Sequence, residues 1–201
     1  MTENAYVRNL RRLTRADPSA EHADAIEREL YASGSDRASV VMFGSYVETI
    51  LERLLTKAVR DDLNSEDRKQ LFEYEGAAGT FSAKIIVAYA FKLIGPMMRS
   101  DLTLIRLLRN EFAHSLMPIG FDTPEVHDVC KQFKIIDLPD SWINDEYLIR
   151  VAGLDRAAAR DRNHPKTRFF TTCNEIAVRM DVARHGFREG DRIYTNDDPV
   201  P

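Results

Sequence analysis

The stretch DRASVVMFGSYVETILERLLTKAVRDD, residues 36–62, decides the fold more clearly than any other part of the chain. Its apolar side chains recur at intervals of three and four residues, which is the period of one buried stripe on an α-helix. The members of this stripe are Val40, Phe43, Val47, Ile50, Leu51, Leu54 and Ala58. The pattern predicts a long amphipathic helix from Asp36 to Asp62.

Three further long segments have helical features. Ser82 to Ile94 is strongly apolar, and Gly95-Pro96 is expected to close it. Asp101 to Ser115 is expected to form the next helix. A last helix is expected from Pro165 to Arg184, shortly before a glycine that can end it. With the helix at 36–62, these segments should supply most of the core.

Shorter helices are expected where capping residues stand. Ser65 can cap one, and Thr123-Pro124 combines a capping hydroxyl with proline at the first helical position. The stretch from Lys134 through Trp142 contains a proline and reads as irregular. No strand-like alternation of useful length and no internal repeat appears. We therefore predict an all-α, single-domain helical bundle.

The bundle is expected to occupy residues 36–186. An N-terminal helical segment, residues 1–35, precedes it and carries Arg8, Arg11, Arg12 and Arg15. A run of this kind could touch nucleic-acid phosphates, but it is more often a solvated face. The tail, residues 187–201, is polar and without period, and we expect it to be loosely ordered.

Composition excludes several classes of protein. The net charge is −4 and the isoelectric point about 5.8, so the chain has no overall positive field to hold a phosphate backbone. The residues at the N-terminus do not form a basic and then apolar signal, and the longest apolar runs are too short to span a bilayer. Cys130 and Cys173 read as reduced core thiols. We expect a cytoplasmic protein without a membrane segment.

The segment RNEFAH, residues 109–114, holds the candidate functional residues. At about 100° per residue, Arg109 falls on the same helical stripe as Ile105 and Phe112, so it interrupts an apolar face. A buried guanidinium without a partner is very costly. We therefore expect Arg109 to pair with a carboxylate, and Glu48 and Glu52, one turn apart on the long helix, are the favoured candidates.

A second, polar stripe runs along the same helix through Arg106, Asn110 and His114. Two interpretations stay open. In one, Asn110 and His114 satisfy backbone carbonyls where the helix ends. In the other, Arg109 binds a phosphodiester and His114 exchanges a proton with the attacking or leaving oxygen, with Asn110 orienting the group.

A longer block of sequence, residues 79–130, resembles the mannitol operon repressor family, and weaker similarity extends the resemblance to roughly 40–185. The resemblance implies an all-helical protein that lacks a recognisable DNA-binding motif and regulates through protein partners. Its order and spacing are more specific than a short motif. The residues that carry it are Gly79-Thr80-Phe81-Ser82-Ala83-Lys84, Ala88-Tyr89-Ala90, Leu93-Ile94, Asp101-Leu102, Ile105-Arg106, Arg109 to Ser115, Phe121-Asp122, Pro124-Glu125 and Cys130.

The segment from Arg109 to His114 is also similar to the signature of HEPN domains, in which an arginine and a polar residue precede a histidine. This second resemblance implies a helical dimer, and for many members a metal-independent endoribonuclease whose active site lies at the dimer interface. Under it, Arg109 and His114 would be catalytic, Asn110 would orient them, and RNA would be the substrate.

Other motifs carry less weight. Lys84 could contact an anion near Gly79, but a solvated lysine near a helix start is the more frequent case. His127 and Cys130 lie three residues apart, yet no further ligand pair accompanies them, so no metal site is expected. Ser45 and Ser82 lack a neighbouring histidine and acid, and no cofactor-binding fingerprint appears.

The sequence thus favours a regulatory interaction module that acts through helix-surface contacts with an unidentified protein and forms a homodimer. The alternative is the metal-independent endoribonuclease. A helix-turn-helix repressor is disfavoured because no short helix pair presents a basic recognition face, and specific binding to duplex DNA is not expected. Arg106, Lys84, Glu48 and Glu52 are expected to serve a binding or structural polar network around the site.

Overall fold

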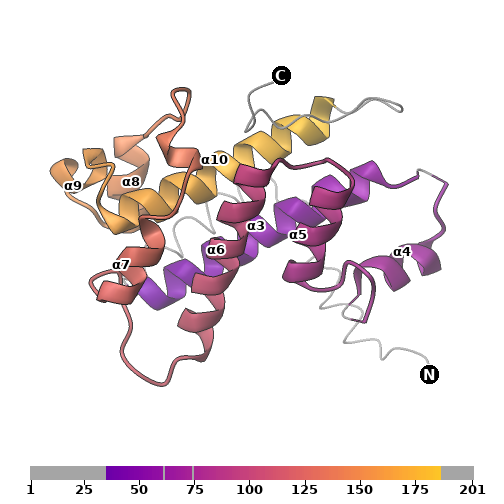
Figure 1. Ribbon diagram of the computed structural model, residues 1–201, viewed down its shortest axis with the longest axis horizontal. Helices are drawn as coiled ribbons and strands as arrows, with labels where there is room; N and C mark the ends of the chain where they lie inside the picture. Colours follow the sequence, from indigo (N-terminus) through magenta and orange to yellow (C-terminus); the bar gives the residue numbers. More distant parts are fainter. Residues whose placement is uncertain (1–34, 61, 74, 187–201) are drawn as a thin grey trace.

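The computed structural model describes residues 35–60, 62–73 and 75–186, and all regular structure in these ranges is helical (Figure 1). The segment with Arg8, Arg11, Arg12 and Arg15 and the tail 187–201 lie outside the described residues. The helices are α3 (Asp36–Ala58), α4 (Ser65–Phe72), α5 (Phe81–Ala90), α6 (Pro96–His114), α7 (Pro124–Cys130), the 3-10 helix η1 (Ile135–Asp137), α8 (Asp145–Ala152), α9 (Arg156–Arg160) and α10 (Pro165–Gly186).

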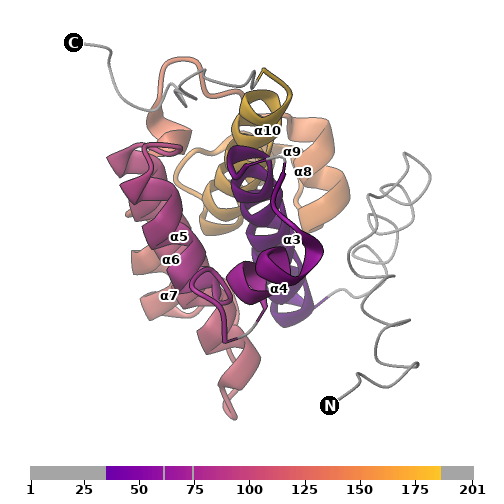
Figure 2. The same ribbon diagram turned by 90° about the vertical axis from the view of Figure 1, so that its right-hand side faces the viewer.

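Helix α3 is the centre of the fold. It packs against α10, α6 and α5, and Figure 2 shows it between α5 and α6 on one side and α8 and α9 on the other. The predicted apolar stripe of this helix is buried from Val40 to Leu54, which confirms its period. The helix ends at Ala58, four residues before the predicted end, because Val59 takes an extended backbone conformation.

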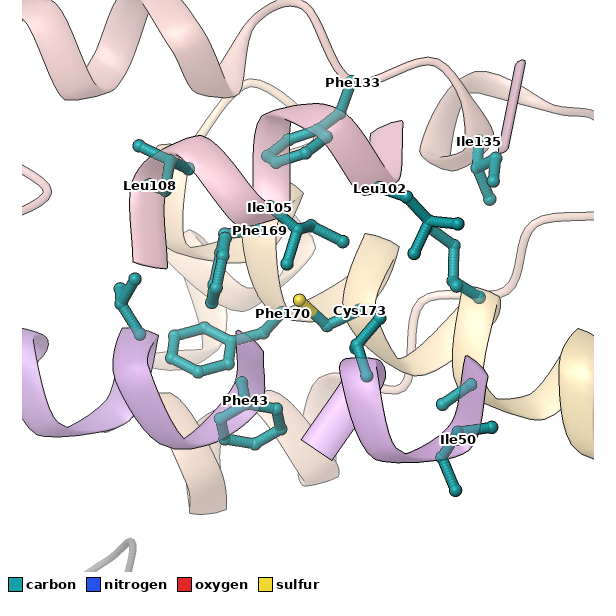
Figure 3. Close-up of a cluster of buried hydrophobic side chains, with 14 of the residues drawn as sticks. Phe43, Ile50, Leu102, Ile105, Leu108, Phe133, Ile135, Phe169, Phe170 and Cys173 are labelled. Atoms are coloured by element: carbon teal, nitrogen blue, oxygen red, sulfur yellow. The ribbon is translucent and has the colours of Figure 1, made fainter. Parts of the chain in front are cut away.

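The core gathers side chains from α3, α6, α10 and the segment before α8 (Figure 3). Its centre is aromatic: Phe169 and Phe170 stand edge to face with ring centroids 5.2 Å apart, and Phe43 meets Phe170 in the same way at 4.8 Å. Such aromatic pairs add roughly 0.5–1.5 kcal/mol to the burial of their area. Cys130 and Cys173 are buried free thiols, as expected.

The boundary between α5 and α6 differs from the prediction. Helix α5 ends at Ala90 rather than Ile94, and the chain turns through Lys92, which has a positive φ of 57°. Gly95 and Pro96 begin α6 instead of only closing the helix before it. Proline at the first helical position loses no hydrogen bond there, since that N–H has no partner within the helix. Helix α6 is therefore five residues longer at its start than predicted.

Two short helices between 134 and 165 were not predicted, and η1 lies in the stretch expected to be irregular. Asn144 caps α8 by accepting a hydrogen bond from the Tyr147 N–H, and Asp155 caps α9 in the same way. At the start of α4, the cap is Asn64 rather than Ser65. No helix in the described part of the chain combines the length and the apolarity needed to cross a membrane.

Candidate functional site

Helices α3 and α6 approach closely at Gly44. A Cβ atom on this residue would lie 2.8 Å from both Cβ and Cγ of Arg109, a distance that real side chains do not tolerate. The absence of a side chain at 44 thus allows the stem of Arg109 to lie directly over α3. From there the guanidinium extends along α3 toward the next turn, where Glu48 stands.

The expected ion pair of Arg109 is present, and its partner is Glu48. Arg109 Nη2 lies 2.7 Å from Glu48 Oε2, and Arg109 Nη1 donates a hydrogen bond of 3.0 Å to Asn110 Oδ1. The Arg109 side chain is 29% exposed and that of Glu48 16%, so the arginine is less buried than its position on the apolar stripe suggested. Its guanidinium is held from two sides.

Lys84 completes a four-residue network with Glu48, Glu52 and Arg109. Its Nζ lies 2.9 Å from Glu48 Oε1 and 2.8 Å from Glu52 Oε2, and its side chain is only 6% exposed. The expectation of a solvated lysine is therefore wrong. A buried ammonium needs paired carboxylates, and α3 supplies two. The network balances two positive with two negative charges and ties α3, α5 and α6 together.

The end of α6 is closed by Arg37, a residue that the sequence did not single out. Its Nη1 donates hydrogen bonds of 2.8 Å to the carbonyls of Phe112 and Ser115, and its Nη2 donates one of 3.1 Å to the Met117 carbonyl. The last carbonyls of a helix lack partners within the helix, and here a guanidinium from the start of α3 satisfies them. The interpretation that Asn110 and His114 perform this task is wrong.

The polar row of Arg106, Asn110 and His114 lies on the outward side of α6. Arg106 and Asn110 are half-buried, and His114 is exposed at the last residue of the helix. Asn110 accepts from Arg109. Among the described residues, neither Arg106 nor His114 has a hydrogen-bond or ion-pair partner. Two of the three side chains in the polar row are therefore not engaged in holding this part of the fold together.

Two buried charged residues matter to the fold and were missed from the sequence. Asp101 of α6 is fully buried and accepts hydrogen bonds from the backbone N–H groups of Lys134 and Ile135. Its burial raises the pKa of the carboxyl to about 6, although those hydrogen bonds favour the charged form. Arg168 of α10 donates to the carbonyls of Cys130 and Phe133. Together they fix the segment that joins α7 to η1.

The remaining candidates do not form a site. Cys130 is fully buried, which raises the pKa of its thiol to about 12, and His127 is half-buried on the same helix. No group of three or more metal-ligating side chains occurs among the described residues. Ser45 donates its hydroxyl to the Val41 carbonyl of its own helix. A shallow hollow elsewhere is lined by Ser141, Trp142, Ile143, Asp145, Arg160 and Arg162.

The chain matches no family model, no curated protein and no solved structure.

Proposed function

We propose that this chain is a regulatory interaction module of the mannitol operon repressor type. It acts as a homodimer and binds another protein through the polar row of α6, without binding duplex DNA specifically. The order and spacing of residues 79–130 support the type of protein. The location of the polar row on the outward side of α6, whose other side packs against α3, supports the binding surface.

The single observation that carries this proposal is the engagement of Arg109. Catalysis on a phosphodiester needs a cation and an acid–base group at one phosphate. Arg109 is held by Glu48 and Asn110, and a phosphate would have to displace the carboxylate. Among the described residues Arg106 has no such partner, but its Cα lies about 12 Å along the helix axis from that of His114. The row therefore fits an extended protein contact better than one reacting phosphate.

The test compares the proteins captured by three tagged forms of the full chain in cells of its source. The wild type and the control variant Lys57→Ala, altered at an exposed position of α3, should recover the same partner. Arg106→Ala/His114→Ala should recover roughly thirtyfold less of it, because removing contacts at the centre of an interface costs about 2 kcal/mol or more. Equal recovery of every protein by all three forms would contradict the proposal.

One observation favours the metal-independent endoribonuclease as a second candidate. Arg37 closes the end of α6, so the exposed His114 ring has no structural duty among the described residues. In that reaction, His114 would take the proton of a 2′-hydroxyl, and the 2′-oxygen would attack phosphorus. The 5′-oxygen would leave and take a proton from water, giving a 2′,3′-cyclic phosphate and a 5′-hydroxyl, and the protonated His114 would return its proton to water. Arg109 would have to exchange Glu48 for the phosphate.

A further inference from the structure

A row of four exposed residues runs along the outward side of α6 at intervals of four: Arg99, Thr103, Leu107 and Glu111. We call it the outer row. Residues four apart lie above one another on a helix and form the ridges that interlock when two helices pack. Helix α6 buries its opposite side in the core through Leu102, Ile105 and Phe112, so the outer row is its unpartnered side.

The two residues in the middle of the outer row, Thr103 and Leu107, are uncharged. Leu107 is 41% exposed, whereas Leu102 and Leu108 of the same helix are buried and Leu104 is half-buried. Thr103 donates its hydroxyl to the Arg99 carbonyl at 2.7 Å. Its hydrogen-bond donor is thus satisfied within its own helix, and the residue needs no water or foreign partner for it. Both middle residues can therefore lose solvent at little cost.

The two ends of the outer row carry opposite charges. The Arg99 guanidinium lies 4.4 Å from the centre of the Tyr89 ring of α5. Stacking on an aromatic face leaves the N–H donors in the guanidinium plane available to a carboxylate. Glu111 is exposed, and neither it nor Arg99 has an ion-pair partner among the described residues. Ile86, one turn before Tyr89, adds apolar surface that is 58% exposed.

We propose that the outer row is the seam of the homodimer, with α6 of one copy packed antiparallel against α6 of a second copy. A two-fold axis between Thr103 and Leu107 reverses the order of the row. Arg99 then meets the partner's Glu111, and Leu107 meets the partner's Thr103. A parallel arrangement would instead place like charges together. The row is self-complementary in charge only in the antiparallel arrangement, and a two-fold interface requires such self-complementarity.

This seam has a consequence for the polar row beside it. In the antiparallel register, His114 lies at the edge of the seam, near the start of the partner's α6, and the two histidines of the dimer lie about 27 Å apart along the helix axis. The dimer therefore carries two separate polar rows rather than one composite site. The seam specifies the homodimer of the proposed function, but it does not depend on which protein the polar rows bind.

Sedimentation equilibrium of the full chain tests the seam by charge reversal. Wild type should be a dimer. Arg99→Glu and Glu111→Arg should each raise the dimer dissociation constant roughly tenfold or more, since each introduces two like-charge contacts. The double variant Arg99→Glu/Glu111→Arg should restore wild-type association to within about threefold. Glu125→Arg, on the exposed side of α7, is the matched control and should not change the constant.

A monomeric wild type, a dimer that neither single variant weakens, or a double variant that fails to recover would each overturn the seam. Circular dichroism of the variants confirms that they remain folded. As a second measurement, Thr103→Cys/Leu107→Cys should form a disulfide-linked dimer under mild oxidation, while Thr56→Cys on α3 should not. The two proposals can fail separately. If the seam variants do not change dimerisation but the wild type still captures a protein that Arg106→Ala/His114→Ala does not, the seam is wrong and the protein-binding role of the polar row stands.

Discussion

Glu48 of α3 and Arg109 of α6 are joined across the helix interface at 2.7 Å, directly above the glycine that lets the two helices approach. The same carboxylate accepts Lys84 from α5 on its other oxygen. One side chain thus binds two cations from two different helices. Because Glu48 holds Arg109 in this network, Arg109 is primarily a structural residue. Its guanidinium can bind a phosphate only if Glu48 is displaced.

Replacing Arg109 by alanine should lower the free energy of unfolding by about 1–3 kcal/mol. A fully buried partner left alone would cost about 3–5 kcal/mol. The effect is smaller here because Arg109 is partly exposed and Glu48 keeps its contact with Lys84. Urea denaturation of the wild type, Arg109→Ala and the exposed control Lys57→Ala measures the difference. An unchanged urea midpoint for Arg109→Ala would mean that Arg109 does not contribute to the stability of the fold.

Gly44→Ala should destabilise the protein by about 1–3 kcal/mol, the usual cost of overpacking. Alanine is the better helix former by about 1 kcal/mol, but its Cβ would meet the Arg109 stem at 2.8 Å. The control is Thr49→Ala at a neighbouring exposed position, where the native hydroxyl donates to the Ser45 carbonyl of its own helix. Thermal unfolding of both variants and the wild type measures the change in stability. A Gly44→Ala protein as stable as the wild type would show that α3 and α6 can move apart at no cost.

The buried Asp101 carboxyl should make the protein less stable as the pH rises from 4 to 7. Its pKa is raised from 3.8 to about 6 in the folded state, because burial disfavours the charged form. The folded chain therefore binds more protons than the unfolded chain between these values. Stability falls through that window by about 3 kcal/mol from this group alone.

Asp101→Asn isolates this contribution from those of other carboxyl groups. As the pH rises from 4 to 7, the unfolding free energy of the wild type should fall relative to that of Asp101→Asn. Denaturation at several pH values measures it. A difference that stays constant over this range would mean that Asp101 titrates near its usual pKa.

The purified protein should not bind duplex DNA specifically. Its net charge of −4 gives no general attraction to phosphates, and the described helices include no exposed basic recognition pair. Fluorescence titration at physiological salt against mannitol-operon upstream DNA and a scrambled duplex is the test. A sequence-dependent dissociation constant near 10⁻⁸ M, typical of specific repressors, would overturn the interaction-module proposal.

Local pattern was sufficient for part of this structure. The period of three and four residues located α3, and an arginine on the apolar stripe of α6 predicted its pairing with a carboxylate one helix away. Thr123-Pro124 marked the start of α7, but the expected capping is absent: the Thr123 hydroxyl accepts from the Gly120 N–H and not from an N–H of the helix. These features depend on neighbours in the sequence or on one face of one helix, and such information is present in the residues themselves.

The missed features depend on contacts between distant segments. Arg37 closes the end of α6 from about 75 residues away in the sequence, and no local sequence pattern predicts that contact. Lys84 stands near the start of α5, where a lysine is usually solvated. Its burial depends on two carboxylates of α3, Glu48 and Glu52, that pair with its ammonium. Gly95-Pro96 fits the end of one helix as well as the start of the next. Helices α8 and α9 are short, and although Asn144 and Asp155 are good caps, packing against α10 stabilises them.

The most direct test of the central claim, that the polar row binds rather than cleaves, is incubation of the purified chain with single-stranded RNA in EDTA. Products are examined for 2′,3′-cyclic phosphate ends. The interaction module should release none, and His114→Ala should behave as the wild type does, while remaining folded. RNA cleavage in EDTA that falls roughly 10²–10⁴-fold in His114→Ala, the usual contribution of one acid–base group, would contradict this account and establish the endoribonuclease.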